Sequence, residues 1–260
     1  MIDVSVIIPC RIGETRVIDA IKSIHDQKIS VEILVGIDGK DSNLRKQIEN
    51  LMISNLSIIE YAKPIGTTKI LNNLLIKSQG TYIARMDADD LSLPNRLESQ
   101  LLFMKLHPDV ALLCSNAYKK DGSTLLMSKS RYLSNKDFLE GNPIIHPTVF
   151  LRSECFKSKS LRYNEKWKRS QDYELWTRVI RSKSMYYNSD PVINYIYNFN
   201  IKNFSQQYFY FNIAFAKNLI WCVFRGGANY QRKDLVLALV KLVNSPITYL
   251  KTIIWNMRND

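Results

Sequence analysis

Three carboxylates lie within four positions of one another in this chain. Asp87, Asp89 and Asp90 follow a strand-like run over residues 81–86. Alternation along a strand would point Asp87 and Asp89 to the same face. Two hard oxygen ligands on one face suit Mg²⁺ or Mn²⁺, which bind few protein carboxylates and complete their shell with substrate phosphates. The spacing therefore predicts a site for a metal-bound diphosphate, and the alternative is a solvated acidic turn that caps the next helix.

The apolar pattern predicts the elements that would position such a site. Five short apolar runs predict strands, and the amphipathic segments between them predict helices. This alternation is typical of an α/β protein with an open, mostly parallel, Rossmann-like sheet flanked by helices. Because ligands bind such sheets at the carboxyl ends of the strands, the segments that follow four of the strands are expected to meet at one crevice. They are Pro9-Cys10-Arg11, Asp38-Gly39, Pro64 to Gly66 and Asp87 to Asp90.

Capping and proline signals predict the helix boundaries. Thr67 or Thr68 is expected to cap a helix that runs to about Lys77. Pro94 is expected at the first position of a helix that runs to about residue 106, and Asp90 could simply cap that helix. In the second half, the sequence predicts a loop at 142–147, a strand at 148–151, a helix at 171–181 and a strand at 191–197.

The composition restricts the class of protein. The chain has 260 residues, of which 46% are hydrophobic, so it can bury a core as one α/β domain with an appendage or as two small domains. Its net charge is +12, and residues 201–260 contain eight Lys or Arg residues against two Asp. This excess of positive charge suits phosphate-bearing ligands, anionic membrane surfaces or nucleic acid.

The cysteines and the N-terminus predict a cytoplasmic location. The four cysteines are widely spaced, which favours reduced thiols over a zinc site or a disulfide framework. No signal-peptide pattern follows Met1, and no uncharged stretch reaches the roughly 20 residues that a spanning helix needs. The sequence therefore predicts that the protein is not an integral membrane protein.

An ordered set of motifs runs through residues 3–200. It comprises Val4 to Pro9, Ser23 to Gln27, Asp38-Gly39, Gly66, Asn72, Gly80 to Ile83, Asp87 to Asp90, Pro94 to Leu97, His146 to Thr148 and Gln171 to Arg178. Each motif is weak alone, but their order and spacing resemble the family 2 glycosyltransferases with the GT-A fold, of the bacterial polysaccharide or lipopolysaccharide type. The resemblance implies transfer of a sugar from a UDP- or dTDP-sugar type of donor to an acceptor hydroxyl, with inversion.

The resemblance also implies roles on the donor side. Asp38 matches the acidic residue that hydrogen-bonds the nucleotide base, although an Asp before Gly is also a common turn residue. Asp87 matches the carboxylate near the ribose and the metal's water shell, and Asp89 matches the direct ligand of Mn²⁺ or Mg²⁺. Lys69 could reach a phosphate or could lie on a solvated helix face. The nucleotide-sugar side is expected to include Pro9, Cys10, Arg11, Gly66 and Ala88.

Asp172 is the expected catalytic base. An inverting transfer needs a carboxylate that takes the acceptor proton while the diphosphate leaves from the opposite face, so base and metal ligands should come from different segments. Asp172 fits that need, and its alternative is an Asp favoured by the dipole at a helix N-terminus. The acceptor or phosphate side is expected to include His146, Gln171 and Trp176. For His146 a structural role is the alternative, and for Trp176 it is packing in the core.

The chain departs from the family pattern at three places. Gln171 stands where a carboxylate usually precedes the base, and it could bind an acceptor hydroxyl. Arg11-Ile12-Gly13 stands where the family commonly has an aromatic residue and Asn, and a single acid, Asp38, precedes Gly39. The nucleotide contacts are therefore less well defined by the sequence than the metal site.

The last 55 residues form a basic, aromatic extension with helical periodicity. We expect residues 1–205 to form the catalytic domain, with a nucleotide-sugar half at about 1–117 and an acceptor half at about 118–205. Residues 206–260 then form a helical extension. One interpretation places this extension on an anionic membrane beside a lipid-linked glycan acceptor. The other packs it on the catalytic domain or on a second subunit, in a homodimer.

Two other functions remain open from the residues alone. A nucleotidyltransferase would also use an α/β sheet with acidic metal ligands, but a Gly-rich basic loop would be expected after the first strand, and residues 11–15 have one Gly and an acid. A basic nucleic-acid-binding module would use the net charge of +12. The acidic cluster opposes it, and no nucleic-acid-binding motif is evident.

Overall fold

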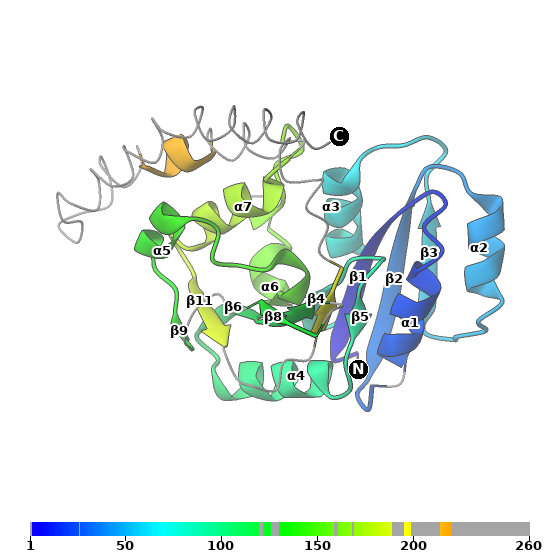
Figure 1. The fold of residues 1–260 in the computed structure, drawn as a ribbon, viewed down its shortest axis with the longest axis horizontal. Helices are drawn as coiled ribbons and strands as arrows, with labels where there is room; N and C mark the ends of the chain where they lie inside the picture. The colour runs from blue at the N-terminus through cyan, green and yellow to red at the C-terminus, as the bar shows by residue number, and fades with distance from the viewer. Residues whose placement is uncertain are drawn as a thin grey trace.

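An eight-stranded sheet forms the centre of the protein. The computed structural model describes residues 2–25, 27–119, 122–125, 130–158, 161–167, 169–188, 195–198 and 214–219. The strand order is β3-β2-β1-β4-β10-β6-β11-β9 (Figure 1). The strands are β1 (Val4–Arg11), β2 (Val31–Asp38), β3 (Leu56–Glu60), β4 (Tyr82–Arg85), β6 (Val110–Ser115), β9 (Arg131–Tyr132), β10 (Phe150–Arg152) and β11 (Ser184–Asn188).

Helices cover both faces of this sheet, as predicted for an α/β protein. One apolar cluster contains buried residues of α1 (Val17–His25), α2 (Ser42–Glu49) and α4 (Arg96–Leu106). The other contains buried residues of α3 (Thr67–Lys77), α5 (Asn135–Glu140), α6 (Ser153–Phe156) and α7 (Gln171–Val179). Strands β1 and β2 are buried along almost their whole length because their side chains face a helical layer on each side.

The sheet is parallel at one end and mixed in its middle. Strand β1 runs parallel to β2 and β4, and β2 runs parallel to β3. Strand β10, however, lies antiparallel between β4 and β6. It follows the short helix η1 (His146–Thr148), whose residues contact the carboxyl ends of β4 and β6. Because the chain enters the sheet from that edge, β10 runs opposite to its neighbours and places His146 at the carboxyl ends.

A second, smaller sheet lies beside the first. Its order is β5-β12-β7-β8, formed by β5 (Leu91–Ser92), β12 (Tyr195–Tyr197), β7 (Ala117–Lys119) and β8 (Thr124–Leu125). Strand β12 is antiparallel to β5 and parallel to β7. The predicted strand at 191–197 is therefore present in its described part. The pairing with β5 brings the chain near residue 195 next to the acidic residues that precede β5.

Two predicted helix starts are wrong. Helix α3 has Gly66 at its N-cap, with φ 89° and no side-chain capping bond, and not Thr67 or Thr68. Helix α4 begins at Arg96, after Asn95 in the left-handed conformation, and not at Pro94. Glycine suits the N-cap of α3 because it has no Cβ and adopts a positive φ without steric strain.

The described part of the C-terminal extension packs against α3 and α7 in one apolar cluster. Residues 214–219 are helical, and Ala214, Phe215 and Leu219 are buried in the cluster that contains α3 and α7. The Lys217 amine lies 5.1 Å from the ring centre of Trp167. The rest of the extension, with most of its predicted helical periodicity, lies outside the described residues. Among the described residues, no helix has the length and apolar character needed to cross a membrane.

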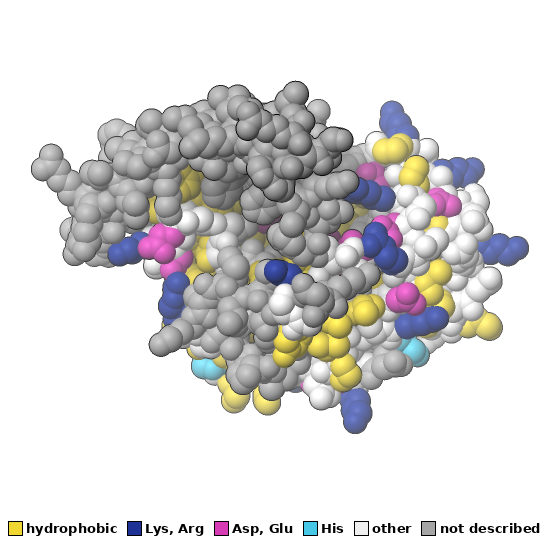
Figure 2. All heavy atoms as spheres, in the orientation of Figure 1, with side chains coloured by type: hydrophobic (Ala, Val, Ile, Leu, Met, Phe, Trp, Pro, Cys, Tyr) yellow, Lys and Arg dark blue, Asp and Glu magenta, His cyan; other side chains and the backbone are white. Residues whose placement is uncertain are grey.

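Charged side chains are dispersed on the face shown in Figure 2. There, the described Lys and Arg side chains stand apart from one another, with Asp and Glu side chains between them. On this face, the described residues do not form the continuous basic stripe that backbone-tracking nucleic-acid binders present.

Candidate active site

The carboxyl ends of β1, β2 and β4 meet at one edge of the sheet. In the register of the sheet, Arg11 at the end of β1 lies opposite Asp38 at the end of β2. The backbone N–H of Met86, just after β4, donates to the carbonyl of Ile7 in β1 (3.1 Å). The Asp38 carboxylate accepts from the N–H groups of Ile65 (2.6 Å) and Gly66 (3.0 Å). These contacts bring all four predicted segments together, as the sequence analysis expected.

The acidic residues lie in a turn and not in a strand. Strand β4 ends at Arg85, and residues 88–89 form a turn. The expectation that strand alternation would place Asp87 and Asp89 on one face is therefore wrong. The side chains of Asp87 and Asp89 are 28% and 31% exposed, whereas Asp90 is 1% exposed. The turn thus separates two partly exposed carboxylates from a buried one.

Asp87 forms a two-pronged ion pair with Arg85. Its Oδ2 accepts from Nη1 (2.8 Å) and its Oδ1 from Nη2 of the buried Arg85 guanidinium. Burial disfavours the Arg85 cation, but the Asp87 carboxylate outweighs this and raises the pKa of Arg85. Both Asp87 oxygens are therefore oriented by a fixed cation, which suits hydrogen bonding to a ligand better than direct coordination of a metal ion.

Asp89 is the carboxylate best suited to a cation. Its Oδ2 accepts from Nδ2 of Asn198 (2.8 Å) and lies 3.5 Å from Nη1 of Arg16, a half-exposed side chain that also pairs with Glu14. In the described part of the chain, no group of three or more His, Cys, Asp or Glu side chains could enclose a metal ion. One partly exposed carboxylate fits Mg²⁺ or Mn²⁺ only if substrate phosphates and water supply most of the shell.

Asp90 does not cap helix α4. It accepts from the hydroxyl of Tyr195 (2.6 Å) and from the backbone N–H of Asn198 (2.7 Å), and the N-cap of that helix is Asn95. Burial, together with the nearby charge of Asp87, raises the pKa of Asp90 to about 7. The cap prediction failed because β12, which is distant in sequence, supplies the partners of this carboxylate.

Asp172 lies in the first turn of α7. Its Oδ2 accepts from Nδ2 of Asn142 (3.0 Å), on the loop before η1. Burial raises the pKa of Asp172, while backbone N–H groups at the start of α7 and the charge of Arg85 oppose that rise. A partly exposed carboxylate with a raised pKa has the proton affinity that a base needs.

A buried cluster links Asp172 with the acidic turn. The imidazole Nε2 of His146 lies 2.7 Å from the Tyr163 hydroxyl, and burial together with the Arg85 cation lowers the pKa of His146 well below its usual value. Tyr163 lies within electrostatic range of Arg85, Asp87 and Asp172. Asp87, which follows β4, and Asp172 of α7 thus both act electrostatically on Tyr163, and the lowered pKa keeps His146 neutral.

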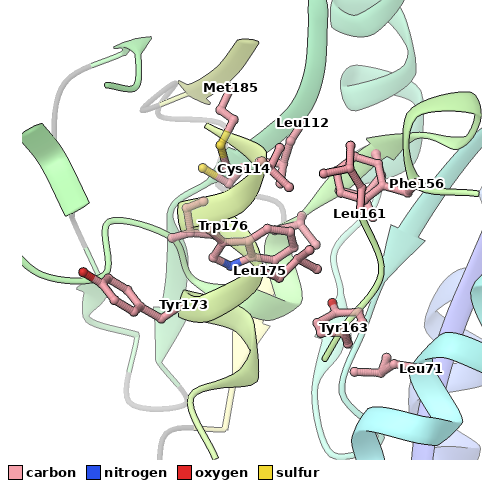
Figure 3. Packing of buried hydrophobic residues seen from close by; sticks show 14 of the residues in the cluster. Leu71, Leu112, Cys114, Phe156, Leu161, Tyr163, Tyr173, Leu175, Trp176 and Met185 are labelled. Carbon is pink, nitrogen blue, oxygen red and sulfur yellow. The ribbon is translucent and has the colours of Figure 1, made fainter. Parts of the chain in front are cut away.

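Trp176 packs in the core and offers no face to a sugar. It is 0% exposed and lies with Phe156, Leu161 and Tyr163 in the same cluster (Figure 3). Its ring meets that of His146 edge-on, with centroids 5.8 Å apart. Trp176 therefore has the core-packing role that was the alternative to sugar stacking, and its ring packs against the imidazole of His146.

The remaining predicted residues divide into exposed and buried ones. Arg11, Gly66 and Lys69 are exposed and Gln171 is partly exposed, so all four are open to a ligand. Pro9, Cys10 and Ala88 are buried. The Cys10 thiol faces the core, where burial and then the charge of Glu14 raise its pKa to about 12. Only the backbone of these three residues could border a nucleotide.

Sequence reasoning missed several residues that complete the site. They are Arg85, Asn142, Tyr163, Tyr195 and Asn198. The bonds from Tyr195 and Asn198 to the acidic turn cross 105 to 109 positions of sequence, so no local pattern reveals them. Arg85 had a local signal, because a lone charge in an apolar strand needs a partner.

Comparison with known proteins identifies the family. The family described as "Glycosyl transferase family 2" matches residues 5–168. An uncharacterized glycosyltransferase of Methanocaldococcus jannaschii is 32% identical over 56% of this chain and 50% of its own length. The amylovoran biosynthesis glycosyltransferase AmsE of Erwinia amylovora is 30% identical over 62% of each chain. The chain thus covers less than two thirds of the length of each of these relatives.

Solved structures share the fold. S. aureus TarS superposes with a TM-score of 0.68 at 17% identity, covering 96% of this chain and 73% of that one. A mannosyltransferase from Pyrobaculum calidifontis, solved with GDP-Man and Mn²⁺, gives 0.64 at 16% identity, covering 96% and 74%. The fold is therefore GT-A, as the motifs implied, and the nucleotidyltransferase and nucleic-acid alternatives find no support. The chain belongs to glycosyltransferase family 2.

Proposed function

We propose that this protein is a metal-dependent, inverting glycosyltransferase that moves a sugar from a nucleotide-diphosphate donor to an acceptor hydroxyl. One observation carries the proposal. Asp87 and Asp172 come from different segments, yet both lie in electrostatic range of Tyr163. Inversion needs the leaving group and the base on opposite sides of one carbon atom, and two carboxylates from different segments near one residue could serve those two sides.

The donor would occupy the edge formed by β1, β2 and β4. Asp38 would accept a hydrogen bond from the nucleotide base through the oxygen that does not bind Ile65 and Gly66. Asp87, held by Arg85, would accept from the ribose, and Asp89 would hold Mn²⁺ or Mg²⁺ at the diphosphate. Such an ion, when bound, neutralises charge on the departing diphosphate. Arg11 and Lys69 are exposed cations close in sequence to this edge.

Proton transfer would belong to Asp172. Its carboxylate would take the proton of the acceptor hydroxyl as the oxygen of that group bonds to the anomeric carbon. The bond between that carbon and the phosphate oxygen breaks, and the nucleoside diphosphate leaves with the bonding electrons. Asn142 would keep the carboxylate aimed at the acceptor by its hydrogen bond of 3.0 Å. Gln171, beside it, would bind a second acceptor hydroxyl.

The relatives suggest the substrate class. AmsE is named for amylovoran biosynthesis, and WbnJ of Escherichia coli, 29% identical over 62% of this chain, for O-antigen biosynthesis. TarS has been solved with UDP and with UDP-GlcNAc. We therefore propose a UDP- or dTDP-sugar donor and a glycan acceptor in the synthesis of a cell-surface polysaccharide, lipopolysaccharide or capsule.

A thermal-shift screen of nucleotide sugars tests this proposal. With Mn²⁺ present, one UDP- or dTDP-sugar is expected to raise the unfolding temperature most, because a ligand at 100 times its Kd adds about 2.7 kcal/mol of stability. GDP-mannose is included for comparison, because a larger shift with it would change the proposed nucleotide to GDP. If no nucleotide sugar shifts the transition with or without Mn²⁺, the proposed activity is wrong.

The extension would bring the enzyme to its acceptor. Residues 201–260 hold eight Lys or Arg against two Asp, which suits an anionic membrane surface at the inner face of the cell membrane. A homodimer through the same segment is the competing arrangement.

Neutralising the extension should weaken membrane binding. In the full chain, the double substitution Lys241→Gln and Lys251→Gln is expected to lower binding to phosphatidylserine vesicles, since each basic residue near the surface contributes about 1 kcal/mol. Vesicle co-sedimentation measures this effect, with Lys105→Gln together with Lys119→Gln as a matched control. Unchanged binding accompanied by a shift from dimer to monomer would favour the dimer instead.

A further inference from the structure

Tyr195 of β12 and Asn198, the residue that follows this strand, hold the acidic turn in place. The Tyr195 hydroxyl donates to Asp90 (2.6 Å) and accepts from the backbone N–H of Asp87 (3.2 Å). Asn198 donates to Asp90 through its backbone N–H (2.7 Å) and to Asp89 through its side-chain amide (2.8 Å). Every residue of the acidic triplet is thus bonded to one of these two residues.

Tyr195 is itself fixed by a buried framework. The Arg96 guanidinium lies 4.5 Å from the centre of its ring, and both side chains are almost fully buried. Arg96 in turn donates to the carbonyl oxygens of Arg85 (2.9 Å) and Pro147 (3.0 Å). Tyr195 is therefore anchored to the end of β4 and to η1, so the position of its hydroxyl does not depend on a surface loop.

We propose that Asn198 and Tyr195 are positioning residues for a divalent cation: Asn198 orients the Asp89 carboxylate, and Tyr195 holds the turn that carries it through Asp87 and Asp90. This inference rests on the proposed function. Asp89 is 31% exposed in a turn, where a free carboxylate would rotate. Among the described residues, Asn198 and Arg16 both approach Oδ2, which leaves Oδ1 for a cation.

The chemistry of the amide suits this role. Asn198 fixes the carboxylate without neutralising it, because an amide donor carries no charge. The full negative charge of Asp89 therefore stays available to a cation. Arg16, whose side chain is 46% exposed, is the cationic side chain that would share the Asp89 carboxylate with the metal ion. Partners of this kind behind a metal ligand typically contribute a factor of roughly 10 to 100 in metal affinity.

Mn²⁺ titration of the full chain tests the inference. Asn198→Ala and Tyr195→Phe are each expected to raise the Mn²⁺ dissociation constant about 10-fold or more, followed by the electron paramagnetic resonance signal of free Mn²⁺ with UDP or GDP present. Affinity for the same nucleotide without metal should stay unchanged, and saturating Mn²⁺ should restore kcat. Asn198→Gln, which keeps the amide donor, should recover part of the affinity.

Matched variants separate positioning from folding. Asn73→Ala removes an amide that bonds Tyr61, and Tyr132→Phe removes a hydroxyl that bonds Asp109 at the surface. Both should bind Mn²⁺ as the unchanged chain does. Wild-type Mn²⁺ affinity in Asn198→Ala and Tyr195→Phe would overturn this inference and leave the proposed function standing. Parallel loss of metal-free nucleotide binding and of stability would assign them a structural role. An unchanged chain that binds no Mn²⁺ would overturn the proposed function as well.

Discussion

Asp172→Asn is expected to leave donor binding intact and to remove sugar transfer. The amide has nearly the same shape but cannot accept the acceptor proton at neutral pH. General-base catalysis contributes about 10²- to 10⁴-fold, so kcat should fall by about that factor. Calorimetry of donor binding and a transfer assay on the same sample measure the two quantities separately.

Glu174→Gln provides the matched control for this variant. Glu174 lies on the same helix but pairs with Arg178, and it should keep its activity. The kcat of the unchanged enzyme should also rise with pH as Asp172 loses its proton. That rise should lie above the range of an ordinary carboxyl group, because burial raises the pKa of Asp172. His146 should add no step near pH 6.5, since its pKa is lowered. Transfer by Asp172→Asn near the wild-type rate would exclude Asp172 as the base.

Asp89→Ala is expected to abolish the Mn²⁺ dependence of nucleotide binding. The substitution removes the partly exposed carboxylate that Asn198 orients, and water cannot replace its charge. Affinity for Mn²⁺ should fall by more than the roughly 10- to 100-fold that loss of an outer partner causes. Calorimetry of nucleoside diphosphate binding with and without Mn²⁺ measures this effect.

The surface carboxylate Asp109 serves as the control for Asp89. Asp109 accepts from Tyr132 far from the crevice, and Asp109→Ala should retain metal-dependent binding. Undiminished metal-dependent binding in Asp89→Ala would mean that another residue is the metal ligand. Asp87→Ala tests the first alternative, Asp87, whose oxygens the structure commits to Arg85.

The sequence predicted well those features that depend on local pattern. Apolar runs identified β1, β2, β3, β4 and β6, and the carboxyl ends of the strands at Arg11, Asp38 and Arg85 met as expected. These predictions succeeded because burial between two helical layers leaves an unbroken apolar stretch in the sequence. The strand predicted at 148–151 is present as β10, but its antiparallel direction was not predicted, because direction depends on the edge of the sheet from which the chain enters.

Residue roles were predicted less completely than the fold. The acidic triplet was found, but the division into exposed Asp87 and Asp89 and buried Asp90 follows from a turn and from β12. Asp90 therefore resembled a cap, although its partners lie more than a hundred positions later. Trp176 posed a similar ambiguity, because a Trp beside a base suits sugar stacking and core packing alike, and only its burial decides between them.

Tyr195 and Asn198 bond to the acidic turn but come long after it in the sequence, so the turn is synthesised before its partners. The ribosome releases Asp89 109 residues before the Asn198 that bonds to it. Because domains form from the N-terminus during synthesis, the nucleotide half can fold while its carboxylates still lack these partners. The family match also ends at residue 168, before this segment. A molecule cut before Tyr195 would thus keep the family's motifs and lose the support of its acidic turn.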